Sequence, residues 1–260
     1  MSSPLIVERR GKILEVTINR PKANAIDAPT SRIMGETFAK FRDDPELRVA
    51  ILTGSGEKFF CPGWDLKAAA EGEAPDSDYG VGGFGGLQEL PGLNKPVIAA
   101  VNGIAFGGGF EIMISADIII AADHATFALP EINSGTLADA ATIKLPRRIP
   151  YHVAMELLFT GRRMDAHEAK QWGIVNEIVT QPNLMIRARE VAAMLAEGPP
   201  LVFAAIKETV RETERLTVQE AFDLVTKRKL KTVDTLYASD DQKEGARAFA
   251  EKRKPVWKGR

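Results

Sequence analysis

A run of three glycines, Gly107, Gly108 and Gly109, joins an apolar segment to a glutamate, Glu111. Glycines at the start of a helix let a ligand approach the backbone, and the exposed N–H groups there favour a negative charge. This segment fits neither the dinucleotide pattern G-x-G-x-x-G nor the phosphate-loop pattern G-x-x-x-x-G-K-[ST]. It therefore indicates a site for an anion that need not be a phosphate.

A second glutamate, Glu131, follows twenty residues after Glu111, directly behind a predicted strand. Two carboxylates on separate elements can converge on one pocket. If the pocket is apolar, one of them keeps its proton near neutral pH while the other stays ionised, as acid/base catalysis requires. Because a glutamate early in a helix is more often a solvated partner of the helix dipole, the residues alone support acid/base chemistry only as a hypothesis.

Residues 59–67, which include Trp64, form a second turn that is predicted to enter a helix. One N–H group from this turn and one from the glycine turn would make an oxyanion hole for a carbonyl that becomes an enolate. Two other interpretations stay open at this point. A triglycine is also found as a flexible loop or a close packing site, and Trp64 could be a half-buried anchor.

Strands that must hold these turns alternate with helices over the first two thirds of the chain. Residues 14–18 alternate apolar with polar side chains, as in a strand with one buried face, and Pro21 ends this strand. Residues 49–53, 97–101 and 118–122 are short apolar runs without alternation, which is typical of strands covered on both faces. The pattern predicts an α/β core.

Helical spacing marks the remaining segments. Asp27 starts a helix that ends near Pro45, and residues 71–92 form a long mobile loop. Apolar residues at helical steps predict further helices at 155–159, 166–172, 185–195, 201–210 and 218–235. We therefore expect a core over residues 1–195 and a helical C-terminal region over residues 196–260 that covers the core or a neighbouring subunit.

Composition excludes several classes of protein. The 260 residues include 34 Lys and Arg against 35 Asp and Glu, which rules out the broad basic surface of a non-specific nucleic-acid binder. A single cysteine, Cys61, excludes an intramolecular disulfide framework and fits a reducing, cytoplasmic compartment. The histidines lie far apart in sequence and none is in a ligand-spaced pair, so we expect no metal site.

The chain has no segment that we predict to enter a membrane. Near its amino end the chain has charged residues at the positions where a secretion signal would have an apolar block. The longest charge-free apolar stretch, residues 96–110, contains Asn102 and four glycines and is shorter than the roughly 20 residues that cross a bilayer. A soluble, cytoplasmic protein is expected.

Together these segments resemble the crotonase family of enoyl-coenzyme A hydratases and isomerases; the matching residues are 19–25, 60–67, 95–111 and 129–131. The resemblance implies a crotonase-like spiral of ββα units with a C-terminal helical trimerisation region, assembled as a homotrimer or a dimer of trimers. It also implies hydro-lyase activity on an acyl-CoA thioester. Coenzyme A is then part of the substrate, and no separate cofactor is expected.

The resemblance also implies roles for residues. Backbone N–H groups of Trp64 and Gly108 would hold the thioester oxygen, while Glu111 and Glu131 would handle water and the α-proton. A further set would line the coenzyme A groove, with the last of its members a weaker candidate for the phosphates: Lys22, Ala23, Ala25, Asp65, Leu66, Lys67 and Lys252.

Longer matches, at residues 21–27, 63–75 and 249–260, are similar to a family member whose short enoyl group carries a trimethylammonium. Such a cation favours an aromatic face, which Trp64, Tyr79 and Phe84 could supply. The predicted reaction is the reversible hydration of this short enoyl thioester.

One segment departs from the family. Its members carry a glycine-rich turn after the second glutamate, which shapes the pocket and donates an amide near that carboxylate, whereas this chain has Ala138, Ala141 and Thr142 here. The added methyl groups would narrow the pocket or misplace the amide. A generic enoyl-CoA hydratase or isomerase, and a weakly active or non-catalytic acyl-CoA-binding homologue, are therefore the alternatives.

Overall fold

A computed structural model describes residues 3–20 and 22–260, so the predicted strand-ending role of Pro21 lies outside the described residues. Within them, the larger of two sheets has six strands in the order β1-β2-β3-β5-β7-β10. β1 and β2 form an antiparallel hairpin, and every later pairing in this sheet is parallel. The strands are β1 (Leu5–Arg10), β2 (Ile13–Ile18), β3 (Val49–Gly54), β5 (Val97–Val101), β7 (Ile118–Ala122) and β10 (Glu177–Val179).

The smaller sheet is built from short strands that follow those of the larger one. In the described residues its order is β4-β6-β8-β9, with β4 (Phe59–Cys61), β6 (Ile104–Phe106), β8 (Thr126–Ala128) and β9 (Met164–Asp165). The chain thus passes three times from a long strand to a short strand to a helical turn, at β3-β4-α2, β5-β6-α3 and β7-β8-η2, where α2 is Leu66–Ala70, α3 is Gly108–Met113 and η2 is the 3₁₀ turn Pro130–Asn133. This is the predicted spiral of ββα units.

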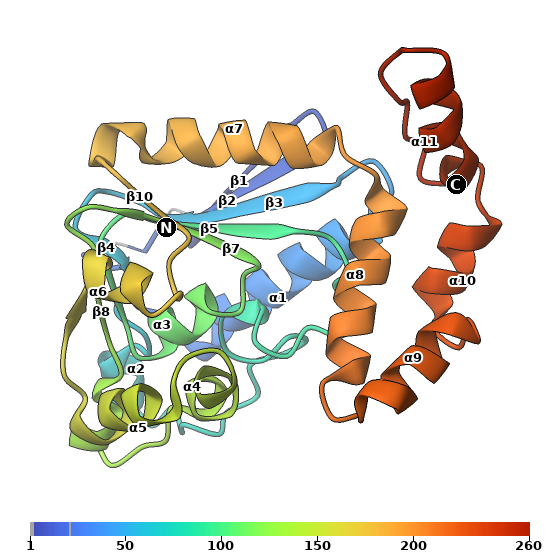
Figure 1. Ribbon diagram of the computed structural model, residues 1–260. Coiled ribbons are helices and arrows are strands. Elements are labelled where there is room, and N and C mark those ends of the chain that lie inside the picture. The colour runs from blue at the N-terminus through green and yellow to red at the C-terminus, as the bar shows by residue number, and fades with distance from the viewer. Residues whose placement is uncertain (1–2, 21) are drawn as a thin grey trace.

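Both faces of the central strands are covered, which explains why their sequences are apolar without alternation. Ile51, Ile98 and Ile120 pack on one face against α7 (Leu184–Ala196). Their sequence neighbours point to the opposite face and join the larger core, which includes helix α1. Figure 1 shows α7 lying across the upper face of the sheet.

Helix α1 (Ala28–Asp43) begins where the sequence predicts. The Asp27 side chain accepts a 2.9 Å hydrogen bond from the amide of Thr30, and this cap satisfies one of the free donors of the first turn. Met34, Phe38 and Phe41 are fully buried on the predicted apolar stripe. The helix therefore closes the core next to the loop over residues 71–92, which has one 3₁₀ turn, η1 (Phe84–Gly86).

The other helices include the expected ones, with one correction, and two that the sequence analysis did not predict, Asp139–Lys144 and Asp241–Ala250. They are α4 (Asp139–Lys144), α5 (Tyr151–Thr160), α6 (Ala166–Gln171), α8 (Pro200–Thr213), α9 (Val218–Thr226), α10 (Lys231–Ala238) and α11 (Asp241–Ala250). The helix predicted over residues 218–235 is wrong as a single helix. Arg228 takes a left-handed conformation with φ 50°, which separates α9 from α10.

Helices α8 to α11 stand together at one side of the molecule (Figure 1). They have a small apolar cluster of their own, made by Ala205, Leu230 and Val233. The expected boundary at residues 195 and 196 falls at the end of α7. None of the helices in residues 3–20 and 22–260 combines the length and apolarity that a bilayer crossing needs.

Candidate active site

The two turns predicted to carry backbone donors touch each other at Gly63. This residue has a φ of 96°, and a Cβ atom added to it would lie 2.9 Å from the amide nitrogen of Gly108. Glycine is therefore required both by the backbone conformation and by the contact. The Gly63 amide itself lies 3.4 Å from Sγ of Cys61, whose buried thiol has its pKa raised to about 12 by desolvation.

Trp64 and Gly108 present free amides next to this contact. The chain on either side of Trp64 is held by hydrogen bonds from Ile26 N to Gly63 O (2.9 Å) and from Asp65 N to Ile26 O (2.8 Å). Among the residues that the structure describes, the N–H groups of Trp64 and Gly108 have no protein acceptor. A carbonyl oxygen placed between them would meet two fixed donors.

Glu111 lies in the first turn of α3 and is only 6% exposed. Its Oε1 accepts a 2.9 Å hydrogen bond from the amide of Ala141, and its Oε2 lies 3.4 Å from the side-chain amide of Gln88. Burial raises the pKa of this carboxyl, while these two donors favour its ionised form. Glu111 is thus buried and held in one orientation.

Glu131, in η2, stands over the glycine turn. A Cβ atom on Gly107 would lie 2.7 Å from its Oε1 and would displace the carboxylate, and the φ of 54° also favours glycine. Its Oε2 is buried and has no hydrogen-bond partner in the described part of the chain. Burial raises the pKa of Glu131 to about 7, and the charge of Glu111 adds to the increase. The structure therefore brings the two glutamates together.

Both glutamates and both turns open into one cavity of about 280 Å³. Its lining residues, all between positions 64 and 139, are Trp64, Pro75, Asp76, Ser77, Tyr79, Phe84, Gln88, Glu89, Gly108, Glu111, Glu131, Thr136, Leu137 and Asp139. Within residues 3–20 and 22–260, no three His, Cys, Asp or Glu side chains are grouped as metal ligands would be. The cavity combines two adjacent carboxylates with two unpaired N–H donors.

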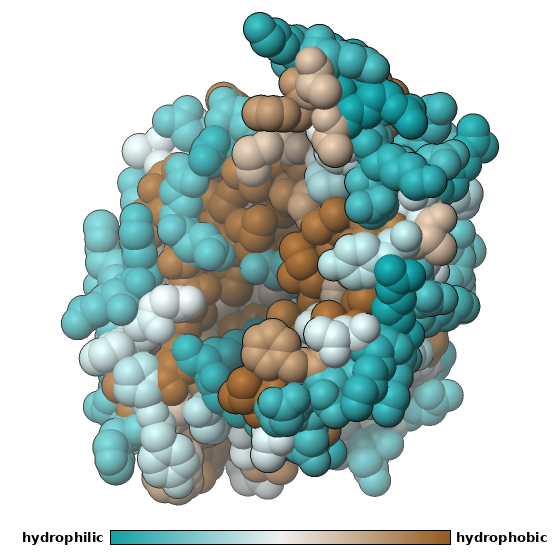
Figure 2. All heavy atoms as spheres, turned by 45° about the vertical axis from the view of Figure 1, so that its right-hand side comes forward, coloured by the Kyte–Doolittle hydropathy of each residue, from teal (hydrophilic) through white to brown (hydrophobic). Residues whose placement is uncertain are grey.

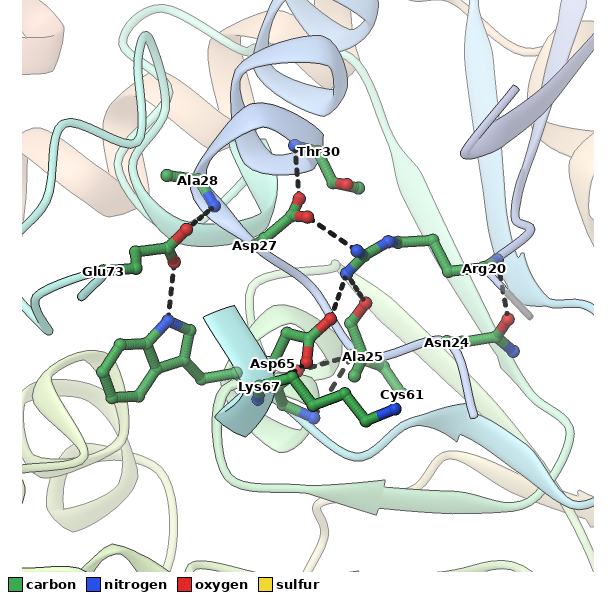
Figure 3. Close-up of polar contacts among 12 residues, drawn as sticks. Arg20, Asn24, Ala25, Asp27, Ala28, Thr30, Cys61, Asp65, Lys67 and Glu73 are labelled. Atoms are coloured by element: carbon green, nitrogen blue, oxygen red, sulfur yellow. Dashed lines mark hydrogen bonds and ion pairs between the residues drawn. The ribbon is translucent and has the colours of Figure 1, made fainter. Parts of the chain in front are cut away.

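The segments expected to line a coenzyme A groove are joined by Arg20 (Figure 3). Its Nη2 donates to Oδ2 of Asp27 at 2.6 Å, its Nη1 lies 3.1 Å from Oδ2 of Asp65, and it also bonds the carbonyl of Ala25. Asp65 in turn accepts from the amide of Lys67 at 3.1 Å and so caps α2.

These contacts bring together two of the expected segments but not the third. Arg20 contacts both Ala25 and Asp65, so it ties the segment of Lys22, Ala23 and Ala25 to the segment of Asp65, Leu66 and Lys67. Lys252 follows α11 in the C-terminal region, and it does not line the cavity.

Glu73 contacts Trp64 in a way that the sequence analysis did not predict. Its Oε1 accepts a 2.6 Å hydrogen bond from Nε1 of Trp64, and its Oε2 accepts a 2.9 Å bond from the amide of Ala28 (Figure 3). The carboxylate thereby ties the long loop to the start of α1 and orients the Trp64 indole. A glutamate in a loop without periodicity gives no pattern by which it could have been found.

The departure near residue 140 has a different effect from the one expected. Instead of a glycine-rich turn, the chain forms helix α4, which alanine favours, and the Ala141 amide bonds Glu111 rather than Glu131. Neither Ala141 nor Thr142 lines the cavity; Thr142 lines a separate apolar cavity of about 210 Å³ beside Glu131. The side chains of Ala141 and Thr142 therefore do not form part of the cavity wall.

A half-buried lysine near Glu111 was also missed. Lys144 Nζ donates to Oγ of Ser115 at 2.8 Å and to the carbonyl of Gln88 at 3.0 Å. Burial lowers the pKa of Lys144 to about 8, against the charge of Glu111, which raises it. The ammonium thus connects the end of α3 to the residue whose amide faces Glu111.

The comparisons with known proteins agree with this fold and site. The family model described as enoyl-CoA hydratase/isomerase matches residues 8–260, and the chain belongs to this family. Among curated relatives, the carnitinyl-CoA dehydratases of Citrobacter koseri and Escherichia coli K12 are 58% and 57% identical to it, each over the full length of both chains.

Solved structures show the same likeness. An enoyl-CoA hydratase from Mycobacterium tuberculosis H37Rv superposes with a TM-score of 0.90 at 38% identity, over all of both chains. An enoyl-CoA hydratase from Bacillus anthracis gives a TM-score of 0.88 at 30% identity, covering 99% of this chain and all of that one. The crotonase fold expected from the sequence is confirmed.

Proposed function

We propose that this protein is a hydro-lyase that interconverts crotonobetainyl-CoA and carnitinyl-CoA by reversible addition of water. The observation that carries the proposal is the meeting of Glu111 and Glu131 in one cavity beside the unpaired amides of Trp64 and Gly108. Similarity to carnitinyl-CoA dehydratases over the full chain supports the choice of acyl group.

The two amides would bind the thioester oxygen. Water adds to the β-carbon of an enoyl thioester only if the negative charge that develops on this oxygen is stabilised. Fixed N–H groups do this without reorganising, and the loss of one such donor typically costs about 10²-fold or more in rate. Trp64 and Gly108 are suited to this role because no protein acceptor in the described residues competes for their N–H groups.

The environments of the two glutamates assign them different protons. Glu111, which accepts from Ala141 and faces Gln88, would be ionised and remove a proton from water as its oxygen attacks the β-carbon. Glu131, with a pKa of about 7 and an unpartnered Oε2, would hold a proton and give it to the α-carbon. Dehydration of carnitinyl-CoA runs through the same steps in reverse.

The coenzyme A portion would lie along the segments joined by Arg20. We assign Lys22, Ala23 and Ala25 to one side of this groove. The other side would be formed by Asp65, Leu66 and Lys67, with Lys252 a weaker candidate because it lies after α11. Coenzyme A is part of the substrate, so we expect turnover without an added cofactor, in the cytoplasm.

Several copies of the chain would assemble through the C-terminal helices. Ile206, Val210, Val218 and Phe222 on α8 and α9 are each more than half exposed, at 54%, 65%, 75% and 61%. Figure 2 shows apolar side chains gathered in the hollow beside these helices. Burial of such surface drives association. A homotrimer or a dimer of trimers is therefore our expectation, and Phe222→Asp should lower the mass measured by light scattering.

A hydration assay over a panel of enoyl-CoA esters tests the proposed function. Crotonobetainyl-CoA should be hydrated far faster than crotonyl-CoA. Equal or reversed rates would leave a generic enoyl-CoA hydratase or isomerase. No hydration of any ester, with coenzyme A ligands still bound, would identify a non-catalytic acyl-CoA-binding protein.

A further inference from the structure

The cavity carries an excess of negative charge that its two glutamates do not account for. Its lining includes five carboxylates and no lysine or arginine; the acidic residues are Asp76, Glu89, Glu111, Glu131 and Asp139. A neutral acyl chain gains nothing from the three carboxylates beyond the catalytic pair. A cationic acyl group would be attracted by those three, Asp76, Glu89 and Asp139.

Two aromatic rings form one wall of the same cavity. Tyr79 and Phe84 meet edge to face, with ring centroids 5.3 Å apart and an angle of 80° between the planes. Phe84 also packs directly on the glycine turn, because a Cβ atom on Gly108 would overlap its ring. The wall therefore starts beside one of the two unpaired amides and extends away from it to Tyr79.

Carboxylates flank this wall at both ends. Oε1 of Glu89 would lie 2.6 Å from a Cβ atom on Gly83, the residue before Phe84. Asp76 lies near Tyr79, whose pKa its charge helps to raise. Within residues 3–20 and 22–260, the Glu89 and Asp76 side chains have neither an ion pair nor a hydrogen bond among the interactions that the structure records, so both carboxylates are available to a ligand.

We propose that Tyr79 and Phe84, together with the carboxylates of Glu89 and Asp76, form a subsite for a quaternary ammonium group at the end of the acyl chain. The subsite deepens the proposed function and rests on it. A thioester oxygen at Gly108 places the start of the acyl chain against Phe84. The chain then leads to Tyr79, where ring faces and carboxylates favour a cation that cannot donate a hydrogen bond.

Trp64 lines the cavity as well, but it lies outside the loop over residues 71–92. Its indole N–H is held by Glu73 at 2.6 Å, which orients the ring. Asp139 lines the cavity from α4 and adds to the general negative field. Specificity for the cation is thus assigned to the loop over residues 71–92, and not to the elements that carry the catalytic glutamates.

The test compares two esters that differ only in charge. One is crotonobetainyl-CoA, and the other is its neutral isostere, in which a tert-butyl group replaces the trimethylammonium. We expect Glu89→Gln and Asp76→Asn each to lower the ratio of kcat/KM for the charged ester to that for the neutral ester by about threefold, because both carboxylates are exposed and solvent screens their attraction for a cation. Glu71→Gln, on the same loop but outside the cavity, is the matched control.

A second pair of variants distinguishes the contribution of the Tyr79 ring from that of the carboxylates. Tyr79→Phe keeps an aromatic face and should retain most of the ratio, whereas Tyr79→Leu should lower it by about tenfold. An unchanged ratio in Glu89→Gln, Asp76→Asn and Tyr79→Leu would overturn the subsite even if the wild type prefers the charged ester.

Binding of the two saturated esters, measured by calorimetry, makes the subsite testable without turnover. If the wild type hydrates no enoyl ester, the proposed function fails, but tighter binding of the ammonium ester that depends on Glu89 would still support the subsite. Equal affinity for the charged and neutral saturated esters would refute it.

Discussion

The amide of Ala141 in α4 and Oε1 of Glu111 in α3 are joined by a hydrogen bond of 2.9 Å between residues thirty positions apart. The bond fixes one oxygen of a carboxylate that is 6% exposed. Because the donor belongs to the backbone, it costs no side-chain entropy and stays in place whatever residue occupies the position, except proline. The second oxygen remains directed toward Gln88 and the cavity.

Replacing either glutamate by glutamine should abolish most of the activity. We expect Glu111→Gln and Glu131→Gln each to lower kcat by about 10²-fold to 10⁴-fold, as for other positioned acid/base groups. The affinity for a saturated acyl-CoA, measured by calorimetry, should change little, and the exposed Glu36→Gln serves as control. Full activity in both glutamine variants would exclude the acid/base mechanism.

Hydration should be fastest near neutral pH. Above pH 7 Glu131 loses the proton that the α-carbon requires, because its pKa is about 7. At lower pH Glu111, whose pKa burial also raises, becomes protonated and can no longer accept a proton from water. The profile of kcat/KM against pH should therefore be bell-shaped. A rate that stays constant from pH 6 to pH 9 would contradict the role of Glu131.

The Glu131 carboxyl should also affect the free energy of unfolding. Its pKa is raised from 4.5 to about 7 on folding, so the folded protein holds the proton more tightly than the unfolded chain does. The contribution of this carboxyl to the free energy of unfolding is fully present below pH 4.5, and it is lost as the pH rises to 7. Glu131→Gln should then be more stable than the wild type at pH 8, on the order of 2 kcal/mol in urea unfolding, and equal to it below pH 4.5.

The contact between the two turns can be tested at Gly63. Gly63→Ala would place a Cβ atom 2.9 Å from the Gly108 amide, so the two donors must separate. We expect kcat to fall by about 10²-fold or more. Gly72→Ala is a matched control, since Gly72 has a similar φ of 107° but open space around it. If kcat fell equally in both variants, backbone strain alone would explain the effect.

Lys144 is expected to act as a positioning residue. Lys144→Met removes the donors to Ser115 and Gln88 and should lower kcat by about tenfold with little change in KM. Since the ammonium favours the ionised form of Glu111, the acidic side of the pH profile should also move to higher pH. The exposed Lys40→Met is the control. A loss of stability without any shift of the profile would mean that Lys144 is only structural.

Much of the fold could be predicted because its signals are local. Buried parallel strands such as β3, β5 and β7 are unbroken apolar runs, and α1 has both a capping residue and an apolar stripe. The strands β4 and β6 were not predicted as such, since three residues carry no measurable period. The break between α9 and α10 depends on one left-handed residue, Arg228, of a type that rarely takes this conformation.

The site could be predicted only in part, for a similar reason. Glycine turns and glutamates are visible as residue types, so Gly108, Glu111 and Glu131 were identified. The donor from Ala141 is a main-chain atom, and residue type says nothing of its direction. Glu73 lies in a loop without regular structure, and it accepts a hydrogen bond from Ala28, which is distant from it in the sequence. Such partners become visible only when the chain is folded.

The position of Cys61 has a practical consequence for assays. Its thiol is completely enclosed next to the Gly63 amide and has a pKa of about 12, so almost no thiolate exists at neutral pH. Thiolates, not thiols, react with aromatic disulfides and alkylating agents. Release of free coenzyme A by contaminating thioesterases can therefore be followed with Ellman-type reagents in the presence of the native protein, which contributes no colour of its own and is not inactivated.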